Sequence, residues 1–258
     1  MDSNLKRYEE FGWDYEYQNP ISEKEIAWYL TYARQTKGPV LELACGSGRL
    51  LSELARAGFD VEGLELSPVM LKITLDRIAH LPSETASRIH LHNIDMTNFE
   101  LAKRFGLIII ADNSFSVLST REQQLSCLQQ IHHHLLSDGR LLITVRLIKP
   151  SHFPDGKRTF GWSKPVRNPS TGEHVTRRGE MELVDNGKRL KGTFYYKTTS
   201  IDGSETITEF PYETLVLSKE DYIALLSEAG FQADTYFDYE KQTDNDDNQV
   251  LCFVCYKS

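Results

Sequence analysis

An acidic side chain stands at or near the carboxyl end of three consecutive apolar runs in this sequence. Glu42 lies in "GPVLELA", Glu65 in "FDVEGLEL" and Asp95 at the end of "RIHLHNID". Parallel strands end at one edge of their sheet, and α/β folds bind ligands at that edge. We therefore expect the three carboxylates to share one crevice.

A glycine-containing loop follows the first of these runs, in "VLELACGSGRL". Gly46 and Gly48 let the backbone approach a ligand closely, and the helix expected next offers unpaired amide groups at its start. The Glu42 carboxylate beside this loop would repel a pyrophosphate but attract a cationic or hydroxyl-bearing ligand. Glu65 follows Gly48 by 17 residues, where nucleotide-binding α/β folds place a ribose-binding carboxylate.

Strand-like and helix-like segments alternate from residue 38 to 148, which predicts a doubly wound parallel sheet. The run "LIIIA" has no polar alternation, as expected of a central strand covered on both faces. The expected strands are 38–44, 59–66, 88–95, 105–112 and 140–148, and the expected helices are 48–58, 67–80 and 121–139.

This regularity stops after residue 148. A segment rich in proline and glycine (149–173) precedes alternating runs over 181–210, whose turn signals Asn186-Gly187 and Asp202-Gly203 predict antiparallel hairpins. A helix over 218–231 and two strands over 232–240 and 248–257 complete the pattern. The expected domains are an N-terminal arm and helix (1–37), a cofactor-binding domain (38–148 and 218–258) and an inserted sheet (149–217) that covers the substrate or mediates dimerisation.

Composition narrows the possible partners. The chain has 29 basic and 37 acidic residues and a formal charge of -8, which disfavours nucleic acid. It has neither a run of roughly 18 apolar residues nor the apolar core of a signal peptide near its start. Four scattered cysteines indicate free thiols in a reducing compartment. We expect a cytoplasmic protein without a membrane partner, as a monomer or a homodimer.

Two motifs suggest metal or redox chemistry, but geometry favours a structural role for both. Cys252 and Cys255 are three apart on an expected strand and so point to opposite faces. His132, His133 and His134 are consecutive in an expected helix, about 100° apart, and cannot converge on one ion.

Four motifs in register resemble the class I S-adenosylmethionine-dependent methyltransferases. The family's acid followed by alternating glycines is similar to residues 42–49, although Ala44 replaces the usual first glycine; its methyl is tolerable if the local φ is negative. The other three are "LELSPVML" (64–71), "NIDM" (93–96) and "DNSF" (112–115). The resemblance covers 40–148 well and 218–257 moderately, and implies a Rossmann-like sheet of order 3-2-1-4-5-7-6.

The resemblance also implies roles for these residues. Glu42 and the glycine loop would hold the methionine portion of S-adenosyl-L-methionine, Glu65 the ribose hydroxyls, and Asp95 with Met96 the adenine, while residues 112–115 would border the transferred methyl group. The full implied set of cofactor-binding residues is Glu42, Ala44, Gly46, Gly48, Arg49, Glu65, Leu66, Met70, Asp95, Met96, Asp112 and Asn113.

The expected acceptor is an amine or hydroxyl of a small molecule, such as an amino sugar or a glycine-like compound. The D/N-PP-Y/F sequence of members that methylate nucleic acids or protein amides is replaced here by "DNSF". Tyr15 and His152 are weak candidates for a general base. The aromatic segment 7–20 is either a lid or an arm packed on the domain. The basic excess over 157–200 serves either an anionic substrate or solvated strand faces.

Three alternatives remain at this point. An NAD-dependent oxidoreductase would also use Glu65, but its fingerprint requires a glycine where Leu51 stands. Aminopropyl transfer would need paired acids after the fourth strand, where only Asp112 is present. The third alternative is a module that binds adenosylmethionine without turnover.

Overall fold

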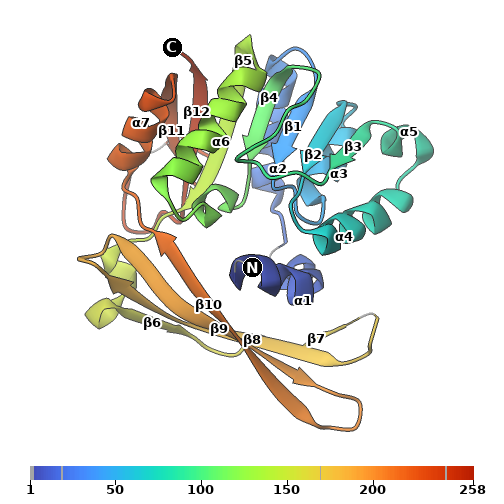
Figure 1. The fold of residues 1–258 in the computed structure, drawn as a ribbon, viewed down its shortest axis with the longest axis vertical. Coiled ribbons are helices and arrows are strands. Elements are labelled where there is room, and N and C mark those ends of the chain that lie inside the picture. Colours follow the sequence, from blue (N-terminus) through green and yellow to red (C-terminus); the bar gives the residue numbers. More distant parts are fainter. Residues whose placement is uncertain (1–2, 19, 169, 242) are drawn as a thin grey trace. The chain divides into compact units, whose positions relative to one another are not determined.

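The computed structural model describes residues 3–18, 20–168, 170–241 and 243–258. Two compact units form from this chain (Figure 1). One consists of Ile21–Leu147 and Leu217–Ser258, and the other of the chain up to Pro20 and Ile148–Val216.

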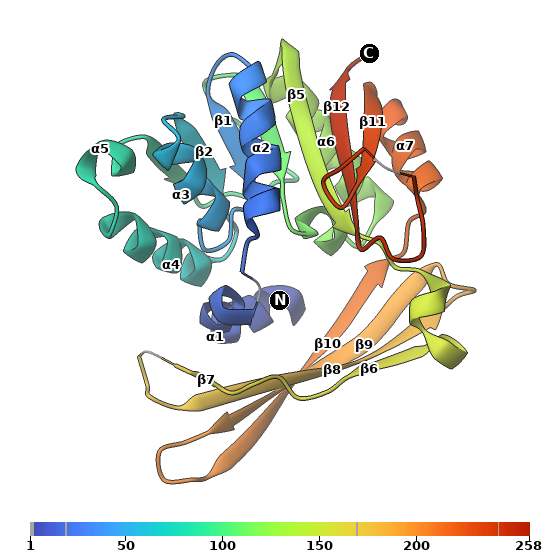
Figure 2. The ribbon, with the colours of Figure 1, turned by 180° about the vertical axis from the view of Figure 1, so that it is seen from behind.

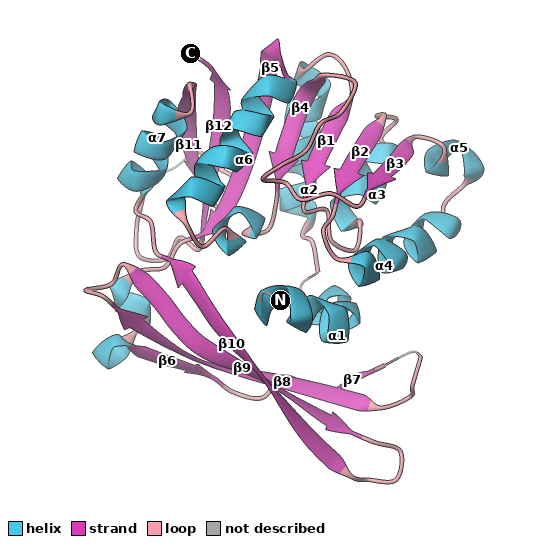
Figure 3. Cartoon of the chain, in the orientation of Figure 1, coloured by secondary structure: helices cyan, strands magenta, loops and turns pink. Residues whose placement is uncertain are grey.

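The first unit is built on a seven-stranded sheet of order β11-β12-β5-β4-β1-β2-β3 (Figure 3). The central strands run parallel, whereas β12 is antiparallel to both β5 and β11. Numbered within this sheet alone, the order is 3-2-1-4-5-7-6, which confirms the fold expected from the sequence. The strands are β1 (Val40–Leu43), β2 (Val61–Leu64), β3 (Ile89–His92), β4 (Phe105–Ile110), β5 (Leu135–Arg146), β11 (Phe231–Phe237) and β12 (Val250–Lys257).

Helices cover both faces of this sheet. Packed against one face are α6 (Arg121–His134) and α7 (Lys219–Glu228), in front of the sheet in Figure 1. The opposite face carries α2 (Glu23–Gln35) and α3 (Arg49–Arg56), seen from behind in Figure 2. Every residue of β4 is buried, as expected of a strand between two helical layers. The remaining helices are α4 (Pro68–Ala79), α5 (Ser83–Ala86) and the 3-10 turn η1 (Ser114–Val117).

The junction between α6 and β5 differs from the expected one. The helix was expected to continue to Gly139, but it ends at His134 and the strand begins directly at Leu135. Leu135 is fully buried and pairs with Phe105, and a register shift follows along β4. Burial of this leucine against the sheet therefore outweighs the helical pattern of its sequence.

The two cysteines of the CxxC motif lie on β12 and face different layers. Cys252 belongs to the core cluster beneath α2 and α3, and Cys255 to the cluster beneath α6 and α7. Both are buried free thiols. Among the described residues, no group of histidine, cysteine or acidic side chains is placed to hold a metal ion. None of the described helices is both long and apolar enough to cross a bilayer.

The second unit is an antiparallel sheet of order β10-β9-β8-β6, with β7 paired to β8, and one helix. Phe11 of the helix stacks on Tyr196 with ring centroids 4.3 Å apart, and Phe210 completes the apolar cluster. Its elements are α1 (Ser3–Gln18), the 3-10 turns η2 (Pro150–His152) and η3 (Pro154–Gly156), β6 (Lys157–Phe160), β7 (Val166–Arg167), β8 (His174–Val184), β9 (Arg189–Thr199) and β10 (Glu205–Leu215).

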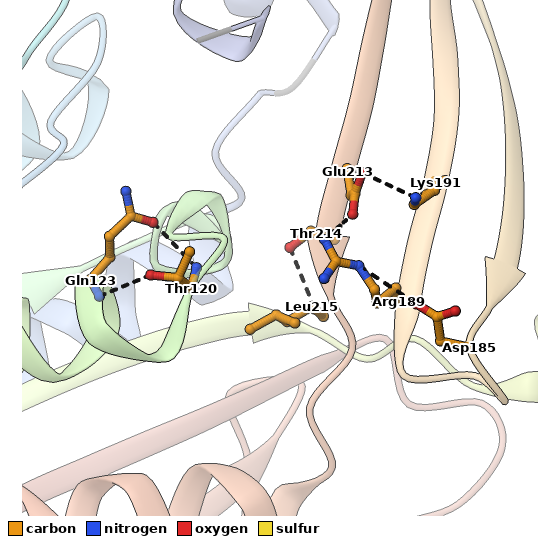
Figure 4. Close-up of polar contacts among 8 residues, drawn as sticks. All are labelled: Thr120, Gln123, Asp185, Arg189, Lys191, Glu213, Thr214 and Leu215. Carbon is orange, nitrogen blue, oxygen red and sulfur yellow. Dashed lines mark hydrogen bonds and ion pairs between the residues drawn. The ribbon is translucent and has the colours of Figure 1, made fainter.

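Several basic residues of this sheet are paired with acidic ones on neighbouring strands. Arg189 and Lys191 of β9 both pair with Glu213 of β10, as the close-up in Figure 4 shows. Lys197 likewise pairs with Glu205 at 3.0 Å. Cross-strand pairing of this kind accounts for part of the basic excess noted in the sequence.

Substitution of Gly106 tests the packing at the start of β4. A Cβ atom on Gly106 would overlap the carbonyl of Lys37, so Gly106→Ala should lower the free energy of unfolding by about 3 kcal/mol or more. Gly161→Ala is the control, because no atom lies within 4 Å of its added Cβ, and it should change stability by less than about 1 kcal/mol. Urea denaturation measures both, and equal effects would contradict this packing.

Candidate functional site

The loop between β1 and α3 has an unusual backbone conformation. Ala44, Gly46 and Gly48 have φ angles of +54°, +57° and +72°. The prediction of a negative φ at Ala44 is therefore wrong. The backbone of Ala44 adopts a left-handed conformation. That conformation destabilises an alanine by roughly 1–2 kcal/mol. The reason is local pairing, since the next amide, Cys45 N, donates a hydrogen bond of 2.9 Å to the Leu64 carbonyl of the adjacent strand.

Glu65 connects this loop to the end of β2. Its Oε2 accepts a hydrogen bond from Gly46 N at 2.9 Å, and its Oε1 accepts one from Ser67 N at 2.8 Å. Burial raises the pKa of Glu65, although both amides oppose that shift. Each carboxylate oxygen has a second lone pair, so the side chain can accept further hydrogen bonds from hydroxyl groups.

Helix α4 holds the same loop from the other side. Thr74 Oγ1 donates to the Gly46 carbonyl at 2.6 Å, and Arg77 Nε donates to the Ser47 carbonyl at 2.9 Å. The Met70 side chain is buried and ends 3.5 Å from where a Cβ on Gly46 would stand. The glycine loop is thus fixed by contacts from α4 and from Glu65.

Glu42 places a carboxyl group inside the protein at the end of β1. The residue is 4 % exposed, and its Oε2 has no hydrogen-bond partner among the described residues. Burial raises the pKa of Glu42 to about 8, the charge of Arg49 opposes this, and the charge of Glu25 adds to it. A buried carboxyl with an unpaired oxygen is destabilising unless it stays neutral or gains a cationic partner.

Arg49, the first residue of α3, links the loop to the end of β4. Its guanidinium forms an ion pair of 2.8 Å with Asp112. Asp112 and Asn113 both have positive φ angles, +49° and +67°. Two consecutive non-glycine residues in this region indicate a strained turn that its surroundings must hold in place.

Thr144 of β5 supports this strained turn. Its Oγ1 accepts a hydrogen bond from Asp112 N at 3.1 Å and lies 2.9 Å from the hydroxyl of Tyr29. Asn113 N donates to the Thr144 carbonyl, and Asn113 Oδ1 accepts from Arg146 N at 2.8 Å. The Asn113 side chain therefore shapes the turn in this structure.

The adenine-binding candidates lie at the ends of β2 and β3. Asp95 is exposed and its Oδ1 accepts hydrogen bonds from Thr97 N and Oγ1, both at 2.8 Å. Met96 is buried, whereas Leu66 is 48 % exposed. Asn93 joins the two strand ends, because its Nδ2 donates to the carbonyls of Glu65 and Leu66. No direct contact joins Asp95 to the glycine loop among these interactions.

The two weak base candidates lie in the second unit. Tyr15 falls in α1, but its side chain is outside the described part of the chain. His152 ends η2, and its amide donates to the Lys149 carbonyl at 2.9 Å.

Sequence motifs missed several residues at the carboxyl edge of the seven-stranded sheet. Glu25 in the first turn of α2 forms a side-chain hydrogen bond with Tyr239, and Tyr29 and Thr144 support the Asp112 turn. The position of α2 immediately before β1 in the sequence could have indicated these residues. The helix that leads directly into β1 must begin at the edge where β1 ends.

Comparisons with known proteins agree with this geometry. Residues 40–139 match the family described as "Methyltransferase domain". The chain is 28% identical over 195 residues to dTDP-3-amino-3,6-dideoxy-alpha-D-glucopyranose N,N-dimethyltransferase of Streptomyces fradiae, which covers 76% of this chain and 70% of that protein. It is also 28% identical over 223 residues to glycine/sarcosine N-methyltransferase of Aphanothece halophytica, covering 84% and 76% of the two chains.

Solved structures show the same fold. The CcbJ methyltransferase from Streptomyces caelestis superposes with a TM-score of 0.75 at 19% identity and covers 95% of each chain. The sugar N-methyltransferase KedS8 superposes with a TM-score of 0.72 at 20% identity, over 96% of this chain and 92% of that one. Residues 40–139 match a methyltransferase domain, and the relatives and solved structures together support an S-adenosylmethionine-dependent methyltransferase, an enzyme whose co-substrate is S-adenosyl-L-methionine. The similarities favour this class over the oxidoreductase and aminopropyl-transfer alternatives.

Ala44 gives a direct test of the loop conformation. Ala44→Gly should stabilise the protein by up to about 1 kcal/mol, because relief of the left-handed strain exceeds the entropy that glycine gains in the unfolded chain. Thermal unfolding measures the change, with Ala55→Gly in α3 as a control that should destabilise by about 1 kcal/mol or more. Destabilisation by Ala44→Gly would contradict the positive φ.

Proposed function

We propose that the enzyme transfers a methyl group to the amine of a small molecule, with a nucleotide-linked amino sugar as the first candidate acceptor. The observation that carries this proposal is the set of three relatives that act on dTDP-linked amino sugars, each aligned over 76% of this chain. A glycine-like amine is the second candidate, supported by the glycine/sarcosine N-methyltransferase.

The residues at the strand ends fit the co-substrate. S-Adenosylmethionine supplies an electrophilic methyl group on a positively charged sulfur. The unpartnered Oε2 of Glu42 suits the ammonium group of the methionine portion. The open backbone at Gly46 permits close approach, whereas the Thr74 side chain occupies the space beside the Gly48 Cα, contrary to the expectation from the sequence. Glu65 has lone pairs left for ribose hydroxyls. Asp95 and Met96 would hold the adenine.

The remaining proposed contacts complete this site. Ala44 and Arg49 border the glycine loop, Leu66 and Met70 flank the end of β2, and Asp112 and Asn113 would border the methyl group. Charge disappears when a sulfonium transfers its methyl group, so the protein contributes mainly by positioning the reactants and excluding water.

The wider setting of the enzyme is also a proposal. The net charge of -8 supports action without nucleic acid. The four free cysteines support a reducing compartment, and we propose a cytoplasmic monomer or homodimer. The inserted segment 149–217 has apolar clusters of its own, which supports a separate role for it as acceptor cover or dimerisation element. Of the expected segment 1–37, the part up to Pro20 is proposed as the N-terminal arm and possible lid, because α2 packs on the seven-stranded sheet.

A panel of acceptors tests the reaction. With methyl-labelled S-adenosylmethionine, we expect transfer to dTDP-3-amino-3,6-dideoxy-α-D-glucopyranose at least tenfold faster than to the matched dTDP-6-deoxyglucose, which lacks the amine. Glycine and sarcosine are tested in parallel. Transfer to hydroxyl compounds but to none of the amines would contradict the amine proposal.

The buried carboxyl group of Glu42 leads us to predict that the protein releases a proton when it binds S-adenosylmethionine. Its pKa of about 8 leaves the carboxyl mostly neutral at pH 7, and an ammonium group beside it would favour the charged form. Binding of S-adenosylmethionine at pH 7 should therefore release about one proton, measured by calorimetry in buffers of different ionisation enthalpy.

The matched variant is Glu42→Gln, which should release about one proton less than the wild-type protein. The stability of the unliganded protein should also depend on the ionisation of Glu42. Because the folded-state pKa is raised, the neutral carboxyl contributes stability that is full below pH 4.5 and is lost as the pH rises to about 8. Glu42→Gln should remove that loss in the unliganded protein. Equal proton release from both proteins would refute the assignment.

A further inference from the structure

Glu25 lies at the same edge of the seven-stranded sheet as the proposed methyl-transfer site. It belongs to the first turn of α2, whose N-cap Ser22 accepts a hydrogen bond from Glu25 N at 3.2 Å. Only residues 36–39 separate α2 from β1. The helix therefore runs back along the sheet, and its first turn stands beside the strands' carboxyl ends.

A turn from the end of the chain fixes the Glu25 side chain. Tyr239, which follows β11, forms a hydrogen bond with the Glu25 carboxyl group. The Tyr239 ring packs against Trp28, with ring centroids 5.7 Å apart. The neighbouring residues Lys24 and Glu240 form an ion pair of 2.8 Å. These contacts hold the turn that carries Tyr239 against the first turns of α2.

The Tyr239 turn is itself well anchored. Asp238 Oδ1 accepts hydrogen bonds from Gln249 N at 3.0 Å and Val250 N at 2.8 Å, at the start of β12. Asp238 and Tyr239 both have positive φ angles, +48° and +67°. As at Asp112 and Asn113, a strained pair of residues is maintained by surrounding hydrogen bonds.

Acidic groups outnumber basic ones around Glu25. Three carboxyl groups, those of Glu25, Asp112 and Glu42, interact with the single guanidinium of Arg49. Burial and the charge of Asp112 raise the pKa of Glu25, while Tyr239 and Arg49 lower it. The titratable and charged groups that interact with Glu25 are Asp112, Arg49, Tyr239, Tyr29, Glu42 and Cys252.

A second observation indicates that a cation completes this cluster. The buried Oε2 of Glu42, in the same electrostatic group, has no hydrogen-bond partner. One cation, the ammonium of the methionine portion, is already assigned to Glu42 under the proposed function. The guanidinium of Arg49 is paired with Asp112 at 2.8 Å, and among the described residues Glu25 forms no ion pair within 4 Å.

The position of Glu25 favours the acceptor as the source of that second cation. The proposed cofactor contacts lie mainly at the ends of β1, β2 and β3. Of the groups that interact with Glu25, Asp112 follows the central strand β4 and Tyr239 follows β11, the edge strand farthest from β3. An aliphatic amine is an ammonium ion near pH 7, and it must lose a proton before its nitrogen can attack a methyl group.

We propose that Glu25, held by Tyr239, binds the ammonium group of the acceptor and accepts its proton, as the general base of the reaction. This proposal rests on the proposed amine methylation. The Glu25 carboxylate takes one proton from R–NH3⁺ and becomes a neutral carboxylic acid. The freed lone pair of nitrogen forms the N–CH3 bond, and the electron pair of the broken S–CH3 bond stays on sulfur. The product, R–NH2⁺–CH3, carries the positive charge that the sulfonium loses.

Glu25→Gln tests this role, with Glu23→Gln as the matched control in the same helical turn. Glu23 is exposed. With dTDP-3-amino-3,6-dideoxy-α-D-glucopyranose as acceptor, kcat/KM at pH 7 should fall at least about 100-fold in Glu25→Gln and less than about twofold in Glu23→Gln. Because the free amine becomes abundant in solution at high pH, the Glu25→Gln rate should rise about tenfold per pH unit and recover most of the loss by pH 9.5.

Two further measurements separate catalysis from structure. The affinity for S-adenosylhomocysteine, measured by calorimetry, should stay within about twofold of wild type in Glu25→Gln. Tyr239→Phe removes a hydrogen bond that lowers the pKa of Glu25, so the acidic limb of its kcat/KM profile should move to higher pH. If Tyr239 only supported the structure, Tyr239→Phe would leave the pH dependence of kcat/KM unchanged.

The following results would overturn the proposal. If wild-type enzyme methylates the amine and Glu25→Gln keeps at least half its rate at pH 7, Glu25 is not the base. Recovery that fails at high pH, or an affinity for S-adenosylhomocysteine that falls as much as the rate, assigns Glu25 to folding or to the co-substrate. If wild-type enzyme methylates no amine of the panel, the amine function fails, and the role of Glu25 fails with it.

Discussion

Burial of the Glu42 carboxyl group at the end of β1 is the constraint on which the site depends. An apolar sheet normally excludes an acid from its interior, because transfer of an unpaired charge out of water is strongly unfavourable. Here β1 lies between β2 and β4 and is covered on both faces, so Glu42 is almost completely buried. The unliganded protein reduces the penalty by keeping the group neutral, and a cationic ligand would relieve it directly.

The backbone around Glu42 is strained at several positions, and each has its own support. Ala44 and the glycines after it are held by Glu65 and α4, while the turn at Asp112 is held by Thr144. Strained conformations persist only where surrounding contacts determine them, and they gather at functional sites. In the unit of the seven-stranded sheet, the non-glycine residues with positive φ lie at the strand ends that the ligand-binding rule for α/β sheets indicates, namely Ala44, Asp112, Asn113, Asp238 and Tyr239.

Much of this arrangement could be predicted from the sequence, because it depends on local patterns. Apolar runs and the alternation of strands and helices predicted a doubly wound parallel sheet, and the resemblance to the methyltransferase family implied the order of its strands. The start of β5 at Leu135 could not be predicted, since it depends on pairing with Phe105 across the sheet. The sign of φ at Ala44 was also inaccessible, because it depends on a hydrogen bond to a neighbouring strand. Glu25 and Tyr239 are 214 positions apart in the sequence, and only the closed fold brings them together.

The central claim is that Glu42 recognises an ammonium group, and a comparison of two ligands tests it most directly. Calorimetry should compare S-adenosylhomocysteine with its analogue that lacks the α-amino group, in wild-type protein and in Glu42→Gln. We predict that loss of the amino group weakens binding to wild type by at least about tenfold, the effect of a charge-assisted hydrogen bond, and that the variant scarcely distinguishes the two ligands. Equal affinity of wild type for both ligands would contradict the account.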